Sequence, residues 1–210
     1  MMHETTIYRD QFIFQRTHSV GAILNVGSNT DGARLAQIGA INLDLREVDH
    51  VTGKHMPVHV LADARALPFR ERFDSVVLGE ILEHMERPDA VAALTEARRA
   101  LKPGGRVVIT MPHDKRRDAG TLETPEGEAK FYAPGIYAYH YRSISKAELL
   151  AWIAEAGLVA TSWARIHYVW GEVGSGVVAQ SAVKRDPYQY LRNSVLGGML
   201  GGIRSGIAPC

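Results

Sequence analysis

The sequence predicts an α/β fold in which a mostly parallel β-sheet carries helices on both faces. The first observation is that short continuous apolar runs, of the length of buried strands, alternate with segments of helical composition. The second is that two long β-prone runs near the C-terminus flank a glycine-bearing turn, which predicts an antiparallel hairpin that closes the sheet. The third is size, since 210 residues with 46% hydrophobic and 22% charged residues suit one globular domain with appendages.

Five apolar runs are the expected parallel strands, with helices between them. The runs are residues 22–26, 40–45, 58–61, 73–78 and 106–111. Residues 31–38 are helical in composition, and residues 81–101 place apolar side chains near helical spacing. The Lys-Pro-Gly-Gly segment at 102–105 is expected to end the second helix, because proline lacks an N–H group and glycine takes the left-handed cap.

One more helix and the hairpin are expected to complete the core. Ser145 and Glu148 form a capping-box pattern that opens a helix over residues 146–156, and Gly157 is its expected C-cap. The two hairpin runs are residues 158–170 and 175–184. The core predicted from these patterns therefore ends near residue 185.

Three segments have no place in this alternation. Residues 112–143 show no clear period and hold four tyrosines, so they are expected to be either a substrate lid or a surface-packed loop. The main domain is predicted to span residues 19–185. Residues 1–18 are predicted as an N-terminal helical segment packed on it. Residues 186–210 form an amphipathic, glycine-rich tail, expected to be helical only when packed against something. We therefore expect a docking role for the tail, such as forming a homo-oligomer.

Composition and charge exclude several classes of protein. Lys and Arg number 24 against 23 Asp and Glu, and the net charge of +1 makes a nucleic-acid partner unlikely by electrostatics. The single cysteine, Cys210, excludes a disulfide framework and a cysteine-rich zinc site. No signal-peptide pattern is present, and no apolar run approaches the ~20 residues of a membrane span. We expect a soluble, cytoplasmic protein that acts on a small molecule.

Three features lie where predicted strands end, which is where α/β sheets bind ligands. Gly27 follows the first strand and allows a ligand close to the backbone. Asp44 ends the second strand, 17 residues after Gly27, where a carboxylate can accept hydrogen bonds from both ribose hydroxyls or cap a helix. Asp63 follows the third strand, where it can accept from an adenine amine or serve as a turn carboxylate. Together they predict a nucleoside site.

At these residues the chain resembles the class I S-adenosylmethionine-dependent methyltransferases of the small single-domain type, similar to methyltransferase type 11. The resemblance spans about residues 20–184. The motifs that carry it are ILNVGSNTDG (23–32), NLD (42–44), ADARALPF (62–69), FDSVVLGEILEH (73–84) and LKPGGR (101–106). They are similar to the family's glycine-rich turn, ribose-binding strand end, adenine-binding segment, fourth strand and link into the fifth strand.

The resemblance implies a Rossmann-like seven-stranded sheet of order 3-2-1-4-5-7-6, with strand 7 antiparallel, that binds S-adenosyl-L-methionine. The implied cofactor-binding residues are Asn25, Gly27, Asn29, Asp31, Asp44, Leu45, Asp63, Ala64, Gly79 and Glu80.

The glycine-rich turn departs from the family pattern at three positions. Asn25 stands where the family usually has an acid, and Asn29 and Asp31 stand where it has further glycines. Asn and Asp tolerate left-handed backbone angles, so the turn can survive. Asp31 is a candidate replacement for the lost acid. Only 13 residues separate Asp44 from residue 58, so the family's helix between strands 2 and 3 is expected to be shortened.

Candidate catalytic bases follow the fourth and fifth strands. His84, His113 and His140 fall in or near the loops there, although a histidine is more often structural. In the alternative interpretation, Glu80, Glu83 and His84 share one helix face at i, i+3 and i+4 and bind a divalent ion. This pattern resembles that of some metal-assisted O-methyltransferases. The main interpretation has no metal.

The resulting hypothesis is an enzyme that transfers a methyl group to an O, N or C nucleophile of a small metabolite, such as a sugar or a natural-product intermediate. One alternative is a non-catalytic cofactor-binding subunit that acts through its C-terminal tail. Another is a nicotinamide dehydrogenase, although the chain lacks the Gly-x-Gly-x-x-Gly pattern of that class.

Overall fold

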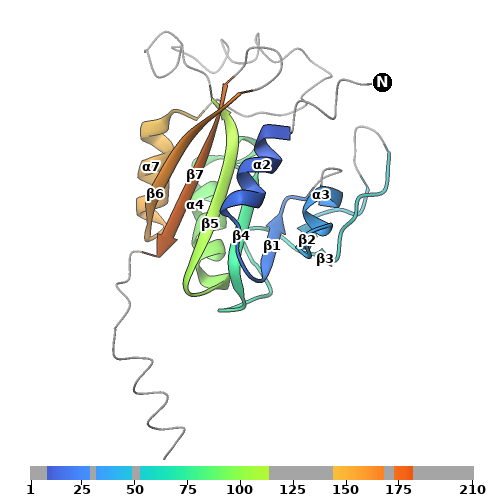
Figure 1. Cartoon of the computed structure of the whole chain (residues 1–210). Coiled ribbons are helices and arrows are strands. Elements are labelled where there is room, and N and C mark those ends of the chain that lie inside the picture. The colour runs from blue at the N-terminus through green and yellow to red at the C-terminus, as the bar shows by residue number, and fades with distance from the viewer. Residues whose placement is uncertain (1–8, 29–31, 49–52, 114–143, 168–172, 182–210) are drawn as a thin grey trace, which may run out of the picture.

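The chain folds around one seven-stranded sheet of order β3-β2-β1-β4-β5-β7-β6 (Figure 1). The computed structural model describes residues 9–28, 32–48, 53–113, 144–167 and 173–181. The strands are β1 (Ile23–Val26), β2 (Ile41–Asp44), β3 (Val60–Leu61), β4 (Phe73–Gly79), β5 (Leu101–His113), β6 (Leu158–His167) and β7 (Val173–Ser181). Strands β1 to β5 pair in parallel, and β7 runs antiparallel to both β5 and β6. The predicted fold class and strand order are confirmed.

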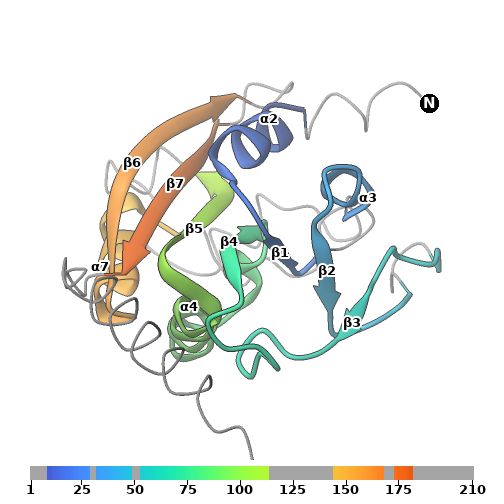
Figure 2. The same ribbon diagram turned by 60° about the horizontal axis from the view of Figure 1, so that its bottom comes forward.

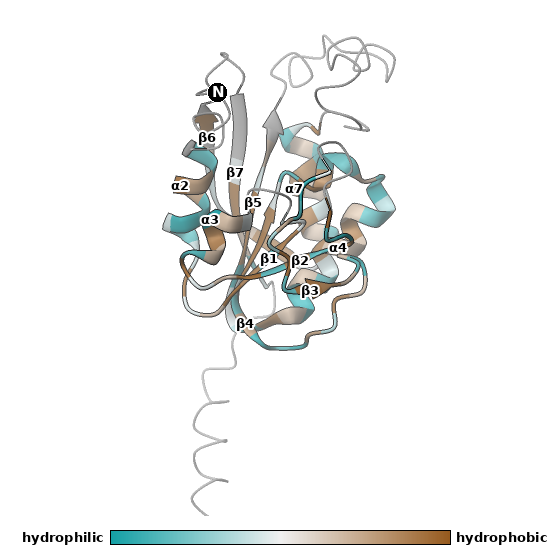
Figure 3. Cartoon of the chain, turned by 90° about the vertical axis from the view of Figure 1, so that its right-hand side faces the viewer, coloured by the Kyte–Doolittle hydropathy of each residue, from teal (hydrophilic) through white to brown (hydrophobic). Residues whose placement is uncertain are grey.

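Two layers of helices enclose the sheet. Helices α2 (Arg9–His18) and α3 (Gly32–Ala36) lie on one face, and α4 (Arg87–Ala100) and α7 (Lys146–Glu155) lie on the other (Figures 2 and 3). Among the described residues no helix has the length and apolarity that crossing a membrane requires.

Side chains alternate between the two faces along each central strand, as the pleat requires. Val76 and Val107 belong to the core that includes α4 and α7, whereas Val77 and Val108 belong to the core that includes α2 and α3. All four are fully buried. Strands that bury both faces need the continuous apolar runs that the sequence shows, because neither face meets water.

Helix α4 packs closely because small residues line its inner stripe. Its buried residues are Ala90, Ala93, Leu94, Ala97 and Ala100, which recur at the spacing of one helix face. Alanine at four of these positions lets the helix lie near the sheet, and the fully buried Leu94 contributes about 1.5–3 kcal/mol by burial.

The start of α7 has the predicted capping box. The Ser145 hydroxyl accepts from the Glu148 N–H, and the Glu148 carboxylate accepts from the Ser145 N–H, so two of the N–H groups left free at a helix start are satisfied. Gly157 follows the helix at φ +72°, where a residue other than glycine would be strained.

The single helix predicted over residues 81–101 is wrong. The segment forms a short 3₁₀ helix, η1 (Leu82–His84), and then the separate helix α4. Met85 and Glu86 between them are extended, and Pro88 lies in the first turn of α4. Proline suits that position because its missing N–H has no partner in a first turn, but in the interior of one long helix it would remove a hydrogen bond.

The Lys-Pro-Gly-Gly segment forms a bulge within β5. Leu101 pairs with Phe73 and Arg106 with Ser75, so residues 102–105 of β5 lie opposite the single residue Asp74 of β4. The Asp74 carboxylate accepts from both Lys102 Nζ and the Ala22 N–H, each at 2.8 Å, and these contacts lower the pKa of Asp74. The segment thus follows a helix end at Ala100, as predicted, and also anchors β5 to β4.

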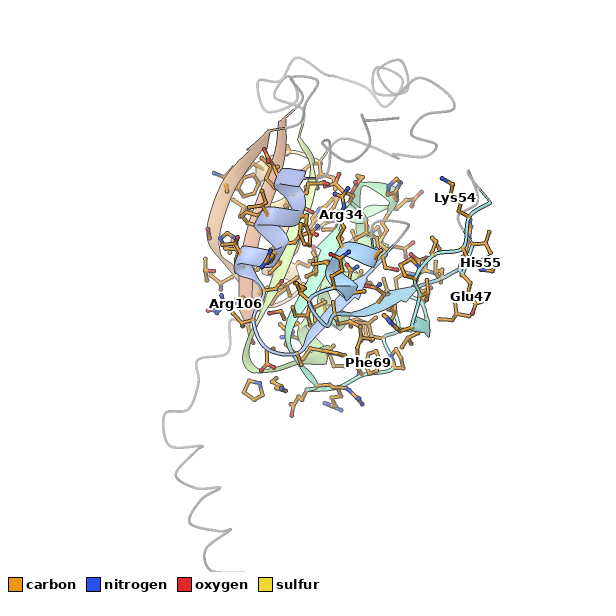
Figure 4. All side chains as sticks on the ribbon, turned by 45° about the vertical axis from the view of Figure 1, so that its right-hand side comes forward. Arg34, Glu47, Lys54, His55, Phe69 and Arg106 are labelled. Carbon is orange, nitrogen blue, oxygen red and sulfur yellow. The ribbon has the colours of Figure 1, made fainter. Side chains whose placement is uncertain are left out.

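The connection between β2 and β3 contains no helix among its described residues, 45–48 and 53–59. Val48 and His55 form an isolated antiparallel bridge, and the Met56 N–H donates to the Glu47 carbonyl at 2.8 Å. Figure 4 shows Glu47, Lys54 and His55 together on this projecting segment. The described residues of this connection are therefore irregular and held by one bridge, in keeping with the expected shortening of the helix.

The two edges of the sheet are short or irregular. Strand β3 has two residues, and β6, which pairs with β7 alone, has a register shift between Ala160 and Ser162. At this bulge the Thr161 hydroxyl donates to the Val178 carbonyl at 3.2 Å. The side chain thus takes up a backbone acceptor of β7 where the ladder is interrupted.

Helix α4 braces the turn that follows β3. The Glu96 carboxylate accepts from the Leu67 N–H at 2.8 Å, and Arg99 donates to the Leu67 carbonyl at 2.5 Å while pairing with Glu96. The hydrogen bonds from Arg99 lower the pKa of Glu96, against the effect of partial burial. Both backbone groups of Leu67 are therefore held by one helix, which fixes the turn against the domain.

This brace predicts an acid-dependent loss of stability. Because the folded-state pKa of Glu96 is lowered, its contribution is present above the ordinary glutamate pKa and is lost as pH falls through the lowered value. We expect Glu96→Gln to reduce the free energy of unfolding by about 1–3 kcal/mol near pH 7 and to flatten its acid dependence. Urea titrations over a series of pH values measure both.

The control is Glu155→Gln, which removes an exposed ion pair that joins Glu155 of α7 to Arg87 of α4. That variant should change stability by less than about 1 kcal/mol. Equal acid dependence in the wild type and in Glu96→Gln would contradict the brace.

Candidate functional site

The carboxyl ends of four neighbouring parallel strands meet at one edge of the sheet. Val26 of β1 is in register with Leu43 of β2 and with Leu78 of β4, and Asp44 is in register with Leu61 of β3. The segments that follow these ends therefore lie along one line. They carry the predicted residues Gly27, Asp44, Leu45, Asp63, Ala64, Gly79 and Glu80.

Gly27 opens this edge in a conformation that favours glycine. Its φ is +69°, and its N–H donates to the Leu43 carbonyl at 2.9 Å. A Cβ added to Gly27 would lie 2.6 Å from Cδ1 of Ile81. The space beside Gly27, which was predicted to admit a ligand, is therefore occupied by the side chain of Ile81 from the segment after β4.

Ser28 places an unsatisfied hydroxyl in the same turn. The residue is 4% exposed, and its Oγ has no hydrogen-bond partner among the described residues. A buried hydroxyl without a partner is costly, so this atom is suited to a polar group of a bound molecule or to water.

Asn25 is tied into a buried amide network. Its Nδ2 donates to Oδ1 of Asn42 at 3.1 Å, across the β1–β2 register. The Asn42 amide in turn donates to the carbonyls of Gly32 at 2.9 Å and Pro57 at 2.8 Å. A carboxylate at position 25 could not donate to Asn42. The hydrogen bond to Asn42 therefore explains why this chain has an amide at the position where the family usually has an acid.

Asp44 ends β2 with a half-buried side chain. Within the turn, the Arg46 N–H donates to its Oδ1 over a long distance of 3.4 Å. Leu45 beside it is 62% exposed. The carboxylate therefore lies at the surface of the strand edge, where a diol could reach it.

Asp63 is held by the second residue after it. Arg65 donates to the Asp63 carboxylate through Nε at 3.0 Å, Nη2 at 2.6 Å and the backbone N–H at 2.8 Å. These hydrogen bonds lower the pKa of Asp63. Ala64 between them is buried. The aspartate is thus an oriented, ionised group. The partner Arg65 was missed in the sequence, because nothing in the chain pattern shows where its side chain points.

A side chain from α2 occupies the space beside Gly79. A Cβ added to Gly79 would lie 2.5 Å from Nε2 of Gln15, which donates to the Thr110 hydroxyl at 2.8 Å. Glu80 follows with φ +52°, a left-handed angle that is uncommon outside glycine, and its N–H donates to the Thr110 carbonyl at 2.8 Å. Gln15 is a second site residue that sequence analysis missed.

The predicted helix face of Glu80, Glu83 and His84 is also wrong, because only the last two lie in η1. Burial, together with the negative charge of Glu80, raises the pKa of Glu83 well above its ordinary value. His84 is 38% exposed, and its Nε2 lies 4.0 Å from Glu83 Oε1. Within the described part of the chain, no group of three or more His, Cys, Asp or Glu side chains could hold a metal ion.

Several predicted residues cannot be placed. Asn29, Asp31 and His140 lie outside the described residues, as do most of the expected lid and the tail. His113 is the last residue of β5, and its side chain is likewise outside what the structure describes. His84 is therefore the one candidate base whose side chain is placed.

The strand order, the antiparallel β7 and the polar carboxyl edge together define the fold of the class I methyltransferases. Residues 24–109 match the family described as Methyltransferase domain. This segment contains β1 to β4 and most of β5. The match confirms the resemblance predicted from the sequence motifs.

Several solved structures share this fold. A SAM-dependent methyltransferase from Methanosarcina mazei has a TM-score of 0.62 at 14% identity, covering 81% of this chain and 98% of that one. Burkholderia thailandensis 1,6-didemethyltoxoflavin-N1-methyltransferase, solved with its named substrate and S-adenosylhomocysteine, has a TM-score of 0.61 at 17% identity, covering 86% and 80%. The CcbJ methyltransferase from Streptomyces caelestis has a TM-score of 0.59 at 18% identity, covering 83% and 94%. A comparison with curated proteins gave no match.

The packing of Gln15 predicts a coupled effect at Gly79. We expect Gly79→Ala to lower the free energy of unfolding by about 1–3 kcal/mol, because the new methyl group must displace the Gln15 amide from Thr110. The same substitution in a Gln15→Ala background should cost less, since the obstructing amide is absent. Chemical denaturation of the four proteins in this double-mutant cycle measures the difference. Equal costs in both backgrounds would refute the contact.

Proposed function

We propose that the protein binds S-adenosyl-L-methionine and transfers its methyl group to an O, N or C nucleophile of a small molecule. The observation that carries the proposal is the placement of the Asp44 and Asp63 carboxylates after adjacent parallel strands, inside the segment that matches the methyltransferase family. Two acidic groups at neighbouring strand ends suit a ribose and a base.

The residues present fit such a cofactor. Asp44 would accept from the ribose hydroxyls, and Asp63 and the Ala64 backbone would meet the adenine ring. The buried Ser28 hydroxyl, which lacks a partner among described residues, would face a polar group at the other end of the molecule. Gly27 and Gly79 have a different role in this proposal, since the space beside each is filled by Ile81 and Gln15.

A small acceptor is favoured over a polyanion. The net charge of +1 gives no overall attraction to nucleic acid. The Burkholderia protein is named for N1-methylation of 1,6-didemethyltoxoflavin and was solved with that compound bound, which supports a small-molecule acceptor for this fold. We also propose that the protein is soluble in the cytoplasm and that it forms a homo-oligomer through its C-terminal tail, residues 186–210.

S-adenosyl-L-methionine supplies an electrophilic methyl group when bound. The chain then has to hold the acceptor atom in line with that group and, for an alcohol or an ammonium, to remove a proton. His84 follows β4 at the binding edge and is partly exposed, so it is the placed residue best suited to take that proton.

Binding of S-adenosylhomocysteine tests the cofactor assignment. We expect Asp44→Ala to weaken binding about ten- to a hundredfold, the scale of charge-assisted hydrogen bonds to two hydroxyls. Isothermal titration calorimetry measures the affinity. Glu47→Ala, which removes an exposed acid three residues later, is the matched control and should leave it unchanged. Equal affinity of wild type and Asp44→Ala would place the ribose elsewhere.

The role of His84 requires a turnover measurement. Against an acceptor found by screening hydroxylated and aminated metabolites, His84→Asn should lower kcat about a hundredfold or more while the affinity for S-adenosylhomocysteine stays near that of the wild type. Formation of S-adenosylhomocysteine in the assay reports the rate. An unchanged kcat would move the base to the loop after β5.

The alternative of a non-catalytic cofactor-binding subunit rests on the altered first turn, where Asn29 and Asp31 stand in place of the family's further glycines. It predicts binding without turnover for every acceptor. A nicotinamide dehydrogenase predicts tighter binding of NAD than of S-adenosylmethionine, which the same calorimeter distinguishes.

A further inference from the structure

Arg65 joins two carboxylates across the nucleoside end of the binding edge. Its Nε and Nη2 face Asp63 on the turn after β3, and its Nη1 lies 3.1 Å from Oδ2 of Asp89 in the first turn of α4. The guanidinium therefore spans from the turn to the helix. The bidentate contact has the fork geometry that arginine alone can provide.

The hydrogen bonds to Asp63 leave one acceptor direction open. An ionised carboxylate offers about four lone-pair sites. The Arg65 backbone N–H and Nε reach Oδ1, and Nη2 reaches Oδ2, with Nε shared at 3.1 Å. Three N–H donors thus engage three of the four sites. The Asp63 side chain is 28% exposed, so the fourth remains within reach of a ligand.

The backbone of this turn is fixed independently of Arg65. Glu96 and Arg99 hold both backbone groups of Leu67, two residues further along. Loss of the Arg65 side chain should therefore leave the turn in place and remove only the guanidinium contacts to the Asp63 carboxylate, whose Oδ1 still accepts from the backbone N–H of residue 65 while Oδ2 is released. The Arg65 side chain therefore determines only how the Asp63 carboxylate is oriented, and with it the direction of the lone pair that stays open.

We propose that Arg65 is a positioning residue that makes the site selective for a 6-amino purine, by holding Asp63 so that its single open acceptor direction faces the exocyclic amine of the base. This inference rests on the proposed function, because it takes Asp63 as the group that meets the base. Asp89 has the supporting role of anchoring the far side of the guanidinium to α4.

The chemistry of the two purines gives the selectivity. Adenine carries an amine at C6 that can donate to the open lone pair. Hypoxanthine carries a carbonyl oxygen there, which would meet the carboxylate with no hydrogen between them. A site built to accept a hydrogen bond rejects an analogue that lacks the donor, because a polar group is then left unpaired. A carboxylate free to rotate could turn away from the carbonyl oxygen and would discriminate less.

The experiment compares S-adenosylhomocysteine with S-inosylhomocysteine by calorimetry. We expect the wild type to prefer the adenine compound and Arg65→Ala to reduce that preference about tenfold or more, mainly by weaker binding of the adenine compound. Arg65→Lys keeps the charge but lacks the fork, so it should also lose most of the preference. Asp89→Ala should lose less, because Arg65 keeps its contact with Asp63.

Arg87→Ala is the matched control, since it removes an arginine of α4 whose ion pair with Glu155 involves neither Asp63 nor Asp89. Its preference should equal that of the wild type, and thermal unfolding of each variant confirms that it is folded. A preference retained in Arg65→Ala, or tighter binding of S-adenosylhomocysteine by that variant, would overturn the inference while leaving the proposed function intact. Failure of the wild type to bind either compound would instead overturn the proposed function.

Discussion

The fully buried amide of Asn42 is the constraint on which the arrangement of the binding edge depends. It accepts from β1 and donates to the start of α3 and to the segment before β3, while its backbone N–H donates to Nδ1 of His59 at 2.9 Å. An amide removed from water must find such partners, since an unsatisfied one costs several kcal/mol. One side chain therefore ties β2, which ends in Asp44, to β1, to the start of α3 and to the segment that leads through β3 to Asp63.

The two glycines at this edge show that lack of a side chain has more than one use. Glycine after β1 is commonly associated with room for a ligand, yet here Ile81 occupies the space beside Gly27 and Gln15 occupies the space beside Gly79. Both intruding side chains come from elements that border the crevice. The glycines thus allow neighbouring side chains to pack close to the ends of β1 and β4, and beside them the Ser28 hydroxyl has no hydrogen-bond partner among the described residues.

Much of this architecture could be predicted from the sequence because it depends on periodicity and on local signals. Buried strands need apolar runs, and the capping box of Ser145 and Glu148 needs only a four-residue pattern. The break after His84 could not be read from apolar spacing, because residues in η1 and α4 both face the core and mimic one continuous helix. The pairing of Arg65 with Asp63 and Asp89 depends on side-chain direction, which spacing along the chain does not encode. The insertion of Gln15 against Gly79 depends on tertiary packing between segments far apart in sequence.

The bulge in β6 has a consequence for the protein in concentrated solution. An outer strand of ten residues with regular hydrogen-bonding geometry would offer a template on which a strand from another molecule could add. The kink between Ala160 and Ser162 interrupts that template near its middle, and at the opposite border β3 is too short to serve as one. The register shift that interrupts the β6–β7 ladder therefore also disfavours cross-β aggregation of the folded protein at high concentration.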